Sequence, residues 1–356
     1  MGVGFFRRIG RCVALVLTTV GAPYCTATTL HVGDIVVTDS EGFGSKGGVV
    51  RVDPKTGQQT VISSQGFFNG PVGVALLGNG LYTGDPTGRP DFQGAVIRVD
   101  LTSGSQTYVA FGGGLVHPGG LTADTDGTLL VCDPFAFDGT GGIFRVNPAT
   151  GAQSAISGRG FLETPIAIAR EASGAYVVAD THANGTGAVI RIDPLTGAQQ
   201  LLSSGGLFAG PTGIAVARDG TLFVSDRDAL GGSGAVFRID PVTGAQAVVS
   251  SGGAFVEPNG MTLDFDGNII VADAKKGIFR VDPVSGGQTL ISAGGNFINP
   301  VGVIVVPEPR ALIALAVIGS LLGRGGSRRR TSQSSRPRVS RQHGTAAAAP
   351  SGGPTR

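Results

Sequence analysis

Two charged residues recur at regular spacing along this chain, and their chemistry is the first question that the sequence raises. An aspartate closes one apolar run in each repeat, at Asp39, Asp85, Asp133, Asp180, Asp226 and Asp273. An arginine lies within the next run, at Arg51, Arg98, Arg145, Arg191, Arg238 and Arg280. Carboxylates could act as acid–base groups, and a ring of arginines could bind an anion. A residue that is present in all six repeats, however, most simply does the same structural work six times. We therefore expect the aspartates to accept hydrogen bonds from the following loop, and the arginines to form structural ion pairs.

Polar residues that are not repeated are better candidates for a functional site, because the repeat itself does not require them. Four of them lie in connections of variable sequence, where binding residues concentrate on rigid scaffolds: His117, His182, Arg89 and Arg227. Two more follow a proline that recurs in every repeat. The residues at this position are Val72, Gly119, Ile166, Thr212, Asn259 and Val301. We predict Asn259, Thr212, His117, His182, Arg89 and Arg227 as binding residues; the alternative is that they are ordinary loop residues.

The sequence contains no established catalytic or metal-binding motif beside these residues. It has no HExxH, no CxxC, no nucleophile elbow and no phosphate-binding glycine loop. A Ser/His/Asp catalytic site built on His117 or His182 is a further alternative, but no sequence motif indicates one. The stretch 137–142 (FDGTGG) could bind Ca²⁺, although it lacks the regular acidic spacing of a dedicated calcium loop. We predict no catalytic residue and no metal, with Ca²⁺ as the alternative.

The elements that must position these residues are short strands. The repeated arginines are separated by 42 to 47 residues, and the repeated prolines keep the same intervals. The fifth unit holds four strand-like runs, at 212–217, 221–226, 235–240 and 245–250, each bounded by turn residues. We name them strands A, B, C and D. Four short antiparallel strands per repeat, six times over, predict the blades of a β-propeller.

The phase of the repeat predicts how the ring closes. The chain enters the first unit at strand B, at 35–39 (IVVTD), and ends with a lone strand A at 301–306 (VGVIVV). That last strand can complete only the blade begun by the N-terminal strands at 35–63. We therefore predict an all-β, six-bladed propeller of four-stranded antiparallel blades over residues 28–306. Closure removes the open sheet edges.

Charge is segregated along the chain. Residues 1–27 carry three arginines and no acid, residues 28–309 carry 15 Lys/Arg against 25 Asp/Glu, and residues 310–356 carry nine arginines and no acid. The body is therefore acidic, with a formal charge of −10 (15 − 25), although the whole chain is +2. Nucleic-acid binding rests on neutralising phosphates, so the body is a poor candidate for it.

The N-terminal residues 1–27 predict a secretory signal peptide. A basic start (Arg7, Arg8, Arg11) precedes an apolar run, and Cys25-Thr26-Ala27 offers small residues for cleavage. Cys132 is then the only cysteine of the mature body, so no internal disulfide is possible there. We expect an exported protein of the cell envelope, the surface or the extracellular space.

The repeated P-x-G-[IV]-A…DG-x-L-x-V-x-D unit resembles NHL repeats and the six-bladed propellers of the gluconolactonase/regucalcin group. In the lactonase-like relatives a cation lies on the axis, held by oxygen ligands near the starts of the inner strands. Of the corresponding positions here, Asn259 alone keeps a matching residue type, and Thr212 is a weak oxygen donor. The resemblance therefore implies the fold more strongly than the activity.

The C-terminus resembles a PEP-CTERM sorting signal. Pro307, Glu308 and Pro309 form the motif, 311–323 (ALIALAVIGSLLG) is apolar, and Arg328, Arg329 and Arg330 follow. The resemblance implies a transient inner-membrane anchor through 311–323 and cleavage by an exosortase-type enzyme. Residues 331–356 predict a disordered tail. The apolar segment is short for a bilayer, and an ordinary apolar tail is the alternative.

These observations favour a binding or interaction protein over an enzyme. We expect its unknown ligand, a polysaccharide or a protein, on the face that carries the variable B–C connections. The alternative is a lactonase-like hydrolase that acts on a small molecule in the axial pocket.

Overall fold

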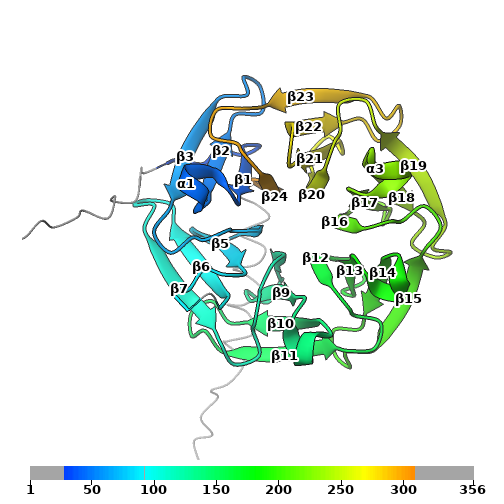
Figure 1. The fold of residues 1–356 in the computed structure, drawn as a ribbon, viewed down its shortest axis with the longest axis horizontal. Helices are drawn as coiled ribbons and strands as arrows, with labels where there is room; N and C mark the ends of the chain where they lie inside the picture. The colour runs from blue at the N-terminus through cyan, green and yellow to red at the C-terminus, as the bar shows by residue number, and fades with distance from the viewer. Residues whose placement is uncertain (1–27, 92, 309–356) are drawn as a thin grey trace, which may run out of the picture.

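The computed structural model describes residues 28–91 and 93–308 as a ring of six four-stranded antiparallel sheets (Figure 1). Blade 1 combines both ends of this region: β24 (Pro300–Val305), β1 (Ile35–Asp39), β2 (Gly48–Val52) and β3 (Gln59–Ser64). Blade 2 holds β4 (Gly73–Leu77), β5 (Gly80–Asp85), β6 (Ala95–Asp100) and β7 (Gln106–Phe111). Blade 3 holds β8 (Leu121–Ala123), β9 (Leu129–Asp133), β10 (Gly142–Val146) and β11 (Gln153–Gly158).

The remaining three blades repeat the same order without a break in the chain. Blade 4 holds β12 (Pro165–Arg170), β13 (Tyr176–Asp180), β14 (Ala188–Ile192) and β15 (Gln199–Ser204). Blade 5 holds β16 (Pro211–Val216), β17 (Leu222–Asp226), β18 (Ala235–Ile239) and β19 (Gln246–Ser251). Blade 6 holds β20 (Pro258–Leu263), β21 (Ile269–Asp273), β22 (Gly277–Val281) and β23 (Gln288–Ser292). The strands predicted for the fifth unit agree with blade 5 to within one residue at each end.

The predicted closure of the ring is confirmed. Strand β24 pairs with β1 in antiparallel register, with Val305 opposite Ile35 and Val303 opposite Val37. One C-terminal strand therefore completes the three N-terminal strands, and the described ring has no open edge at the seam.

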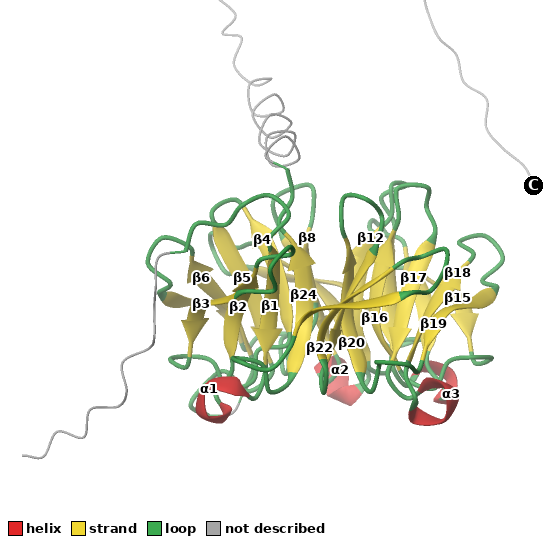
Figure 2. Cartoon of the chain, turned by 90° about the horizontal axis from the view of Figure 1, so that it is seen from above, coloured by secondary structure: helices red, strands yellow, loops and turns green. Residues whose placement is uncertain are grey.

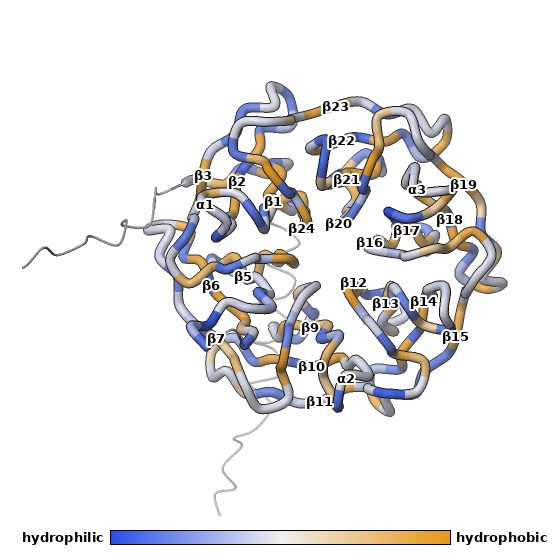
Figure 3. The backbone as a smooth tube through the Cα atoms, viewed as in Figure 1, coloured by the Kyte–Doolittle hydropathy of each residue, from blue (hydrophilic) through white to orange (hydrophobic). Residues whose placement is uncertain are grey.

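The core lies between the blades because strand B of each blade is buried on both faces. All residues of β1, β9, β13, β17 and β21 are buried, whereas the outermost strands, such as β19, are mostly half-buried or exposed. One apolar cluster joins Val177 and Val189 of blade 4 to Leu222 and Phe237 of blade 5. Figure 3 shows the same distribution: hydrophobic stretches run through the strands of every blade and do not gather in a single layer.

Most of the repeated prolines are followed by a glycine two positions later, because neighbouring inner strands approach closely there. A Cβ atom on Gly213 would lie 2.6 Å from the carbonyl oxygen of Asn259, and one on Gly302 would lie 2.2 Å from that of Val72. Both distances are below the contact limit of real side chains. The P-x-G step is therefore a packing requirement of the ring.

Hydrogen bonds at the outer strands join each blade to the next. The amide of Gln246 in β19 donates to the hydroxyl of Ser203 in β15 (2.9 Å), and its oxygen accepts the N–H of Leu207 (2.7 Å). Ser203 in turn donates to the carbonyl of Gly244 (2.8 Å). The same bonds recur at four other joints; the sixth, between blades 2 and 3, has Ala110 in place of the serine.

The two faces of the ring differ in their connections. The A–B and C–D turns form one face, called here the hairpin face; the B–C and D–A connections form the other, called the loop face. Short helices occupy four B–C connections: α1 (Gly42–Ser45), α2 (Ala136–Gly139), η1 (Ala183–Gly185) and α3 (Ala229–Gly232). Figure 2 shows α1, α2 and α3 together on the loop face.

Both ends of the described chain lie at the hairpin face. The N–H of Thr28 donates to the carbonyl of Leu101 in a C–D turn (3.3 Å), and the N–H of Val306 donates to the carbonyl of Asp34 (2.8 Å). Segments that precede residue 28 or follow residue 308 therefore attach opposite the variable connections.

Candidate functional site

The six repeated aspartates are structural, as predicted, and each connects two loops. The carboxylate of Asp226 accepts the N–H groups of Ala209 (2.8 Å) and Gly210 (3.0 Å) from the D–A connection before its blade. It also accepts the N–H of Asp228 (3.1 Å) from the following loop. Equivalent bonds form at Asp39, Asp85, Asp133, Asp180 and Asp273. The prediction included the following loop; the bonds to the preceding connection are new.

Burial raises the pKa of several of these carboxyls. Desolvation raises the pKa of Asp85 to about 6, against the opposing hydrogen bonds from the N–H groups of Asn69 and Thr87. Burial likewise raises the pKa of Asp133, Asp180 and Asp226. These shifts follow from a structural position repeated around the ring and do not mark an active site.

The prediction that the repeated arginines form ion pairs is correct for five and wrong for Arg238. The pairs are Arg51 with Asp34 (2.5 Å), Arg98 with Asp100 (3.2 Å), Arg145 with Asp124 (3.2 Å), Arg191 with Glu171 (2.7 Å) and Arg280 with Asp264 (3.2 Å). Arg238 instead donates to the carbonyl of Pro283 in the next blade (2.8 Å). In blades 3, 4 and 6 the partner acid stands six residues after the repeated proline (Asp124, Glu171 and Asp264), and blade 5 has Ala217 there. Blades 1 and 2 also lack an acid at this position, but Arg51 and Arg98 pair with acids elsewhere, Asp34 and Asp100. Arg238 makes neither kind of pair.

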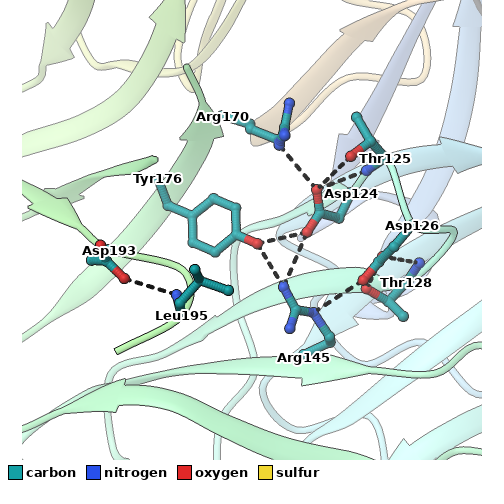
Figure 4. Close-up of polar contacts among 9 residues, drawn as sticks. All are labelled: Asp124, Thr125, Asp126, Thr128, Arg145, Arg170, Tyr176, Asp193 and Leu195. Atoms are coloured by element: carbon teal, nitrogen blue, oxygen red, sulfur yellow. Dashed lines mark hydrogen bonds and ion pairs between the residues drawn. The ribbon is translucent and has the colours of Figure 1, made fainter. Parts of the chain in front are cut away.

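At the joint between blades 3 and 4 the repeated arginine has several polar partners (Figure 4). Asp124 accepts hydrogen bonds from the hydroxyl of Tyr176 (2.6 Å) and from Arg145 (3.2 Å), and it forms an ion pair with Arg170 (3.2 Å). Burial alone would raise the pKa of Asp124, but Tyr176, the N–H of Thr125 and the two arginines together hold it below its usual value. Burial, and then the bond to Asp124, raises the pKa of Tyr176 to about 12.

A central channel of about 660 Å³ runs between the six strands A. Its described lining is mostly aliphatic, including Val72, Ile166 and Val301, and it contains no Asp, Glu or His. Three of the predicted site residues, Thr212, Asn259 and Arg227, line it together. The structure therefore brings half of the predicted set to one place.

The polar side chains that line this channel differ in whether they already have hydrogen-bond or ion-pair partners. The hydroxyl of Thr212 donates to the carbonyl of Pro258 (2.9 Å) and is buried. The carbonyl of Asn259 accepts a hydrogen bond from Ser225, while its side-chain amide makes none among the described residues. The alternative that Asn259 is a loop residue hydrogen-bonded to backbone is therefore wrong, because it lies in β20 with its amide free. Arg227 is paired with Asp228 (3.2 Å).

The two histidines lie apart from the channel and from each other. The ring of His117 packs edge-on against that of Phe135, with centroids 4.8 Å apart. The backbone N–H of His117 donates to the carboxylate of Asp133 (2.9 Å). Nδ1 of His182 lies 3.1 Å from the hydroxyl of Thr164. Neither histidine is hydrogen-bonded to a serine, so the structure does not assemble the Ser/His/Asp site among the described residues.

Arg89 belongs to an aromatic patch at the rim of the loop face, defined here by Phe67, Arg89, Tyr108 and Phe111. The Arg89 guanidinium lies 4.4 Å from the centre of the Phe111 ring and is paired with Asp91 (3.0 Å). Phe67 stacks on Tyr108 with centroids 4.3 Å apart. Phe67 and Phe111 are 40% and 48% exposed, so this apolar surface faces solvent. The sequence analysis named Arg89 but missed the three rings.

The proposed calcium loop does not gather carboxylates. Phe137 and Asp138 have left-handed backbone angles, and Asp138 pairs with Arg159 at the surface (3.3 Å). Among residues 28–91 and 93–308, no three His, Cys, Asp or Glu side chains lie close enough to hold a metal ion together.

Most of the predicted terminal features lie outside the described residues. These are the signal peptide at 1–27, Pro309, the apolar segment 311–323, the cluster Arg328–Arg330 and the tail 331–356. Pro307 and Glu308 are described, and Pro307 lines the hairpin-face end of the channel. Within the described part of the chain, none of the helices has the length and apolar character needed to cross a bilayer.

Comparison with known proteins supports the fold. No family model and no curated protein matches the chain. Among solved structures, it is similar to a chain from a nidogen/laminin complex, with a TM-score of 0.61 and 15% identity over 76% of this chain and 97% of the other. It is also similar to TolB from Acinetobacter baumannii, with a TM-score of 0.60 and 14% identity over 78% of this chain and 67% of TolB. At these identities the likeness shows the architecture, a six-bladed β-propeller.

Proposed function

We propose that this chain is an exported propeller that binds a partner protein through its loop face and is sorted at the cell envelope through its C-terminus. The observation that carries the proposal is the separation of the two faces. Both ends of the described chain are at the hairpin face, opposite the variable connections. A segment anchored in a membrane beyond residue 308 would leave the loop face free for a partner.

The chemistry of the loop face supports a protein partner. Exposed aromatic residues and arginine are enriched at protein interfaces, and they carry much of the binding energy there. The aromatic patch offers both, on strands and connections held by the rigid ring. One structurally similar chain comes from a protein–protein complex, that of nidogen with laminin. A polysaccharide is the other ligand expected from the sequence.

The proposal is tested by placing a photo-crosslinking residue at Phe111 and, as the matched control, at Leu195. Leu195 is 93% exposed in a C–D turn on the hairpin face. In intact cells we expect a discrete protein adduct from position 111 and none from position 195. The adduct should be reduced at least fivefold by the further substitution R89Q. Equal adducts from both positions would contradict a specific loop-face site.

The polysaccharide alternative has its own readout. If the aromatic patch binds sugar, purified envelope polysaccharide should shift the NMR signals of its tyrosine and phenylalanine rings. The chain contains no tryptophan, so these rings supply the aromatic signals. Shifts at Tyr108 without any protein adduct at position 111 would replace the protein partner with a polysaccharide.

Export and sorting are tested on the mature protein. We expect mass spectrometry to find an N-terminus close to residue 28 and a C-terminus close to the Pro307–Pro309 motif. A mature protein that retains residues 310–356 would contradict cleavage by an exosortase-type enzyme.

The lactonase-like alternative concerns the channel. Its polar groups are Asn259, Thr212 and Arg227, within a lining that holds no carboxylate among the described residues. Divalent-dependent hydrolysis of a lactone, lost in N259A and retained in the neighbouring variant T262A, would favour the enzyme over the binding protein.

A further inference from the structure

The joint between blades 5 and 6 contains a groove on the hairpin face, remote from the loop face. Its volume is about 640 Å³, within the range of small-molecule sites. The A–B turns of both blades and the C–D turn of blade 6 form its walls. Its charged and aromatic lining consists of Arg218, Asp219, Phe223, Arg238, Asp264, Phe265 and Asp266.

Two arginines in this groove are not in direct contact with a carboxylate. Among the described residues, neither Arg218 nor Arg238 forms an ion pair of 4.0 Å or less, and both are exposed; Arg238 acts on Asp219 only at longer range. Arg238 is also the only one of the six repeated arginines that is exposed; the other five are intermediate in burial. Its guanidinium donates to the carbonyl of Pro283 (2.8 Å) and lies 5.8 Å from the centre of the Phe223 ring.

The vacancy arises because three residues that close the joint between blades 3 and 4 are replaced here. Ala217 stands in the position of Asp124, Leu263 in that of Arg170, and Ile269 in that of Tyr176. The first and third replacements remove the two groups that bond the repeated arginine in blade 3, and the second removes the other arginine that pairs with Asp124. The groove is thus the open counterpart of the network in Figure 4.

The acids around the groove limit which anion can enter. Asp264 is already paired with Arg280 (3.2 Å). Asp219 accepts the N–H of Thr221 (2.9 Å), and this bond, with a smaller contribution from Arg238, holds the pKa of Asp219 below its usual value. Asp219 and Asp266 are exposed and negative, so they would repel a polyanion.

We propose that this groove binds a small monocarboxylate with an apolar or aromatic body. The carboxylate takes the place of the missing acid beside Arg238, with Arg218 as a second cation, since a guanidinium fits a carboxylate in a bidentate geometry. The apolar body packs against Phe265, which is 38% exposed, and Val284, which is 91% exposed. This site is separate from the loop face, so it does not depend on the proposed function.

The test uses N-acetyl-L-phenylalanine as the probe, titrated into the full-length chain by calorimetry. We expect saturable binding with one site per chain. The neutral amide of the same compound should bind at least tenfold more weakly, because it cannot replace the missing carboxylate. Binding of the acid and the amide with equal affinity would overturn the proposal, as would no binding of either.

Variants of the groove separate charge from shape. A217D restores the acid found in blades 3, 4 and 6 and should weaken probe binding at least tenfold without disturbing the fold. A217N adds a side chain of similar size without a charge and should weaken binding less than threefold. R238Q should weaken it at least tenfold, whereas R159Q, on the opposite face, should not change it. Equal losses in A217D and A217N would show that the groove selects by shape and would overturn recognition of a carboxylate.

Discussion

Two joints of the ring start from the same repeated arginine and end in different states. At the joint between blades 3 and 4, Arg145 meets Asp124 and Tyr176 and the space is filled by polar contacts. At the joint between blades 5 and 6, Arg238 meets a backbone carbonyl and an open groove. The residue type alone therefore does not tell whether a repeated arginine has a structural role. That role depends on which partner residues surround it. To interpret a residue in one repeat, the positions of its contact partners must therefore be compared between repeats as well.

The largest effect on both joints should come from opening the ring at its seam. A chain that ends at Asn299 lacks β24 and leaves the edge of β1 unpaired. We expect it to unfold or to oligomerise, which size-exclusion chromatography with light scattering and thermal unfolding would detect. A chain that ends at Val306 keeps β24 and is the matched control. A stable monomer ending at Asn299 would contradict the strand arrangement.

At the paired joint, D124A should lower the free energy of unfolding by about 3 kcal/mol, because it leaves two arginines and a buried tyrosine hydroxyl without their acceptor. The control is D126A at a neighbouring acid, half exposed and 3.5 Å from Arg145, for which we expect less than about 0.5 kcal/mol. Urea unfolding measures both. Similar losses in the two variants would mean that the network does not hold this joint.

The structure also predicts opposite pH responses for Asp85, whose pKa is raised by burial, and for Asp124, whose pKa is lowered, despite its burial, by its hydrogen bonds and arginines. The folded-state pKa of Asp85 is about 6, above its unfolded value, so its contribution to stability is present below about pH 4 and is lost as the pH rises through 6. The stability difference between wild type and D85N should therefore fall by about 3 kcal/mol from pH 3.5 to 7.5. Asp124, whose pKa is lowered, should contribute stability that is lost as the pH falls.

Urea unfolding at several pH values, with NMR titration of the Asp85 carboxyl, measures this response. A difference between wild type and D85N that stays constant with pH would show that Asp85 is ionised in the fold at no cost.

The smallest effect is expected at the open joint. A217D should pair with Arg238 and raise the free energy of unfolding by about 0.5 kcal/mol, because an exposed pair contributes little. Thermal unfolding at low and high salt would measure the gain and its screening. A loss of stability would mean that Arg238 cannot reach the position that its counterparts occupy.

The fold could be predicted well from the sequence because the same strand and turn signals recur in every repeat. Strand bounds in blade 5, the closure by β24 and the role of Asp226 all follow from apolar runs, turn residues and phase. The short helices in four B–C connections were not expected, because connections of seven or eight residues are too short to show a helical periodicity.

The candidate sites were predicted less well because they depend on contacts between distant parts of the chain. Phe67, Tyr108 and Phe111 meet only because blade 1 leads into blade 2 beside β7. Arg238 was expected to be paired like its counterparts. Aligning Ala217 with Asp124, Glu171 and Asp264 shows that blade 5 lacks the acid of those blades. The alignment alone does not separate Arg238 from Arg98, whose blade has Leu77 at the same position and which pairs with Asp100.

The seam has a consequence for the order in which this protein can mature. The partner of β1 is the last strand of the ring, and 260 residues separate Asp39 from Asn299, which precedes it. A chain made from its N-terminus onward therefore carries an unsatisfied sheet edge until Val305 has emerged. Blades 2 to 6 can each form from local sequence, but the circle is completed only after synthesis of the whole domain. Pairing of β24 with β1 therefore occurs only in a full-length domain, and a truncated product keeps an unpaired strand edge that proteases can attack.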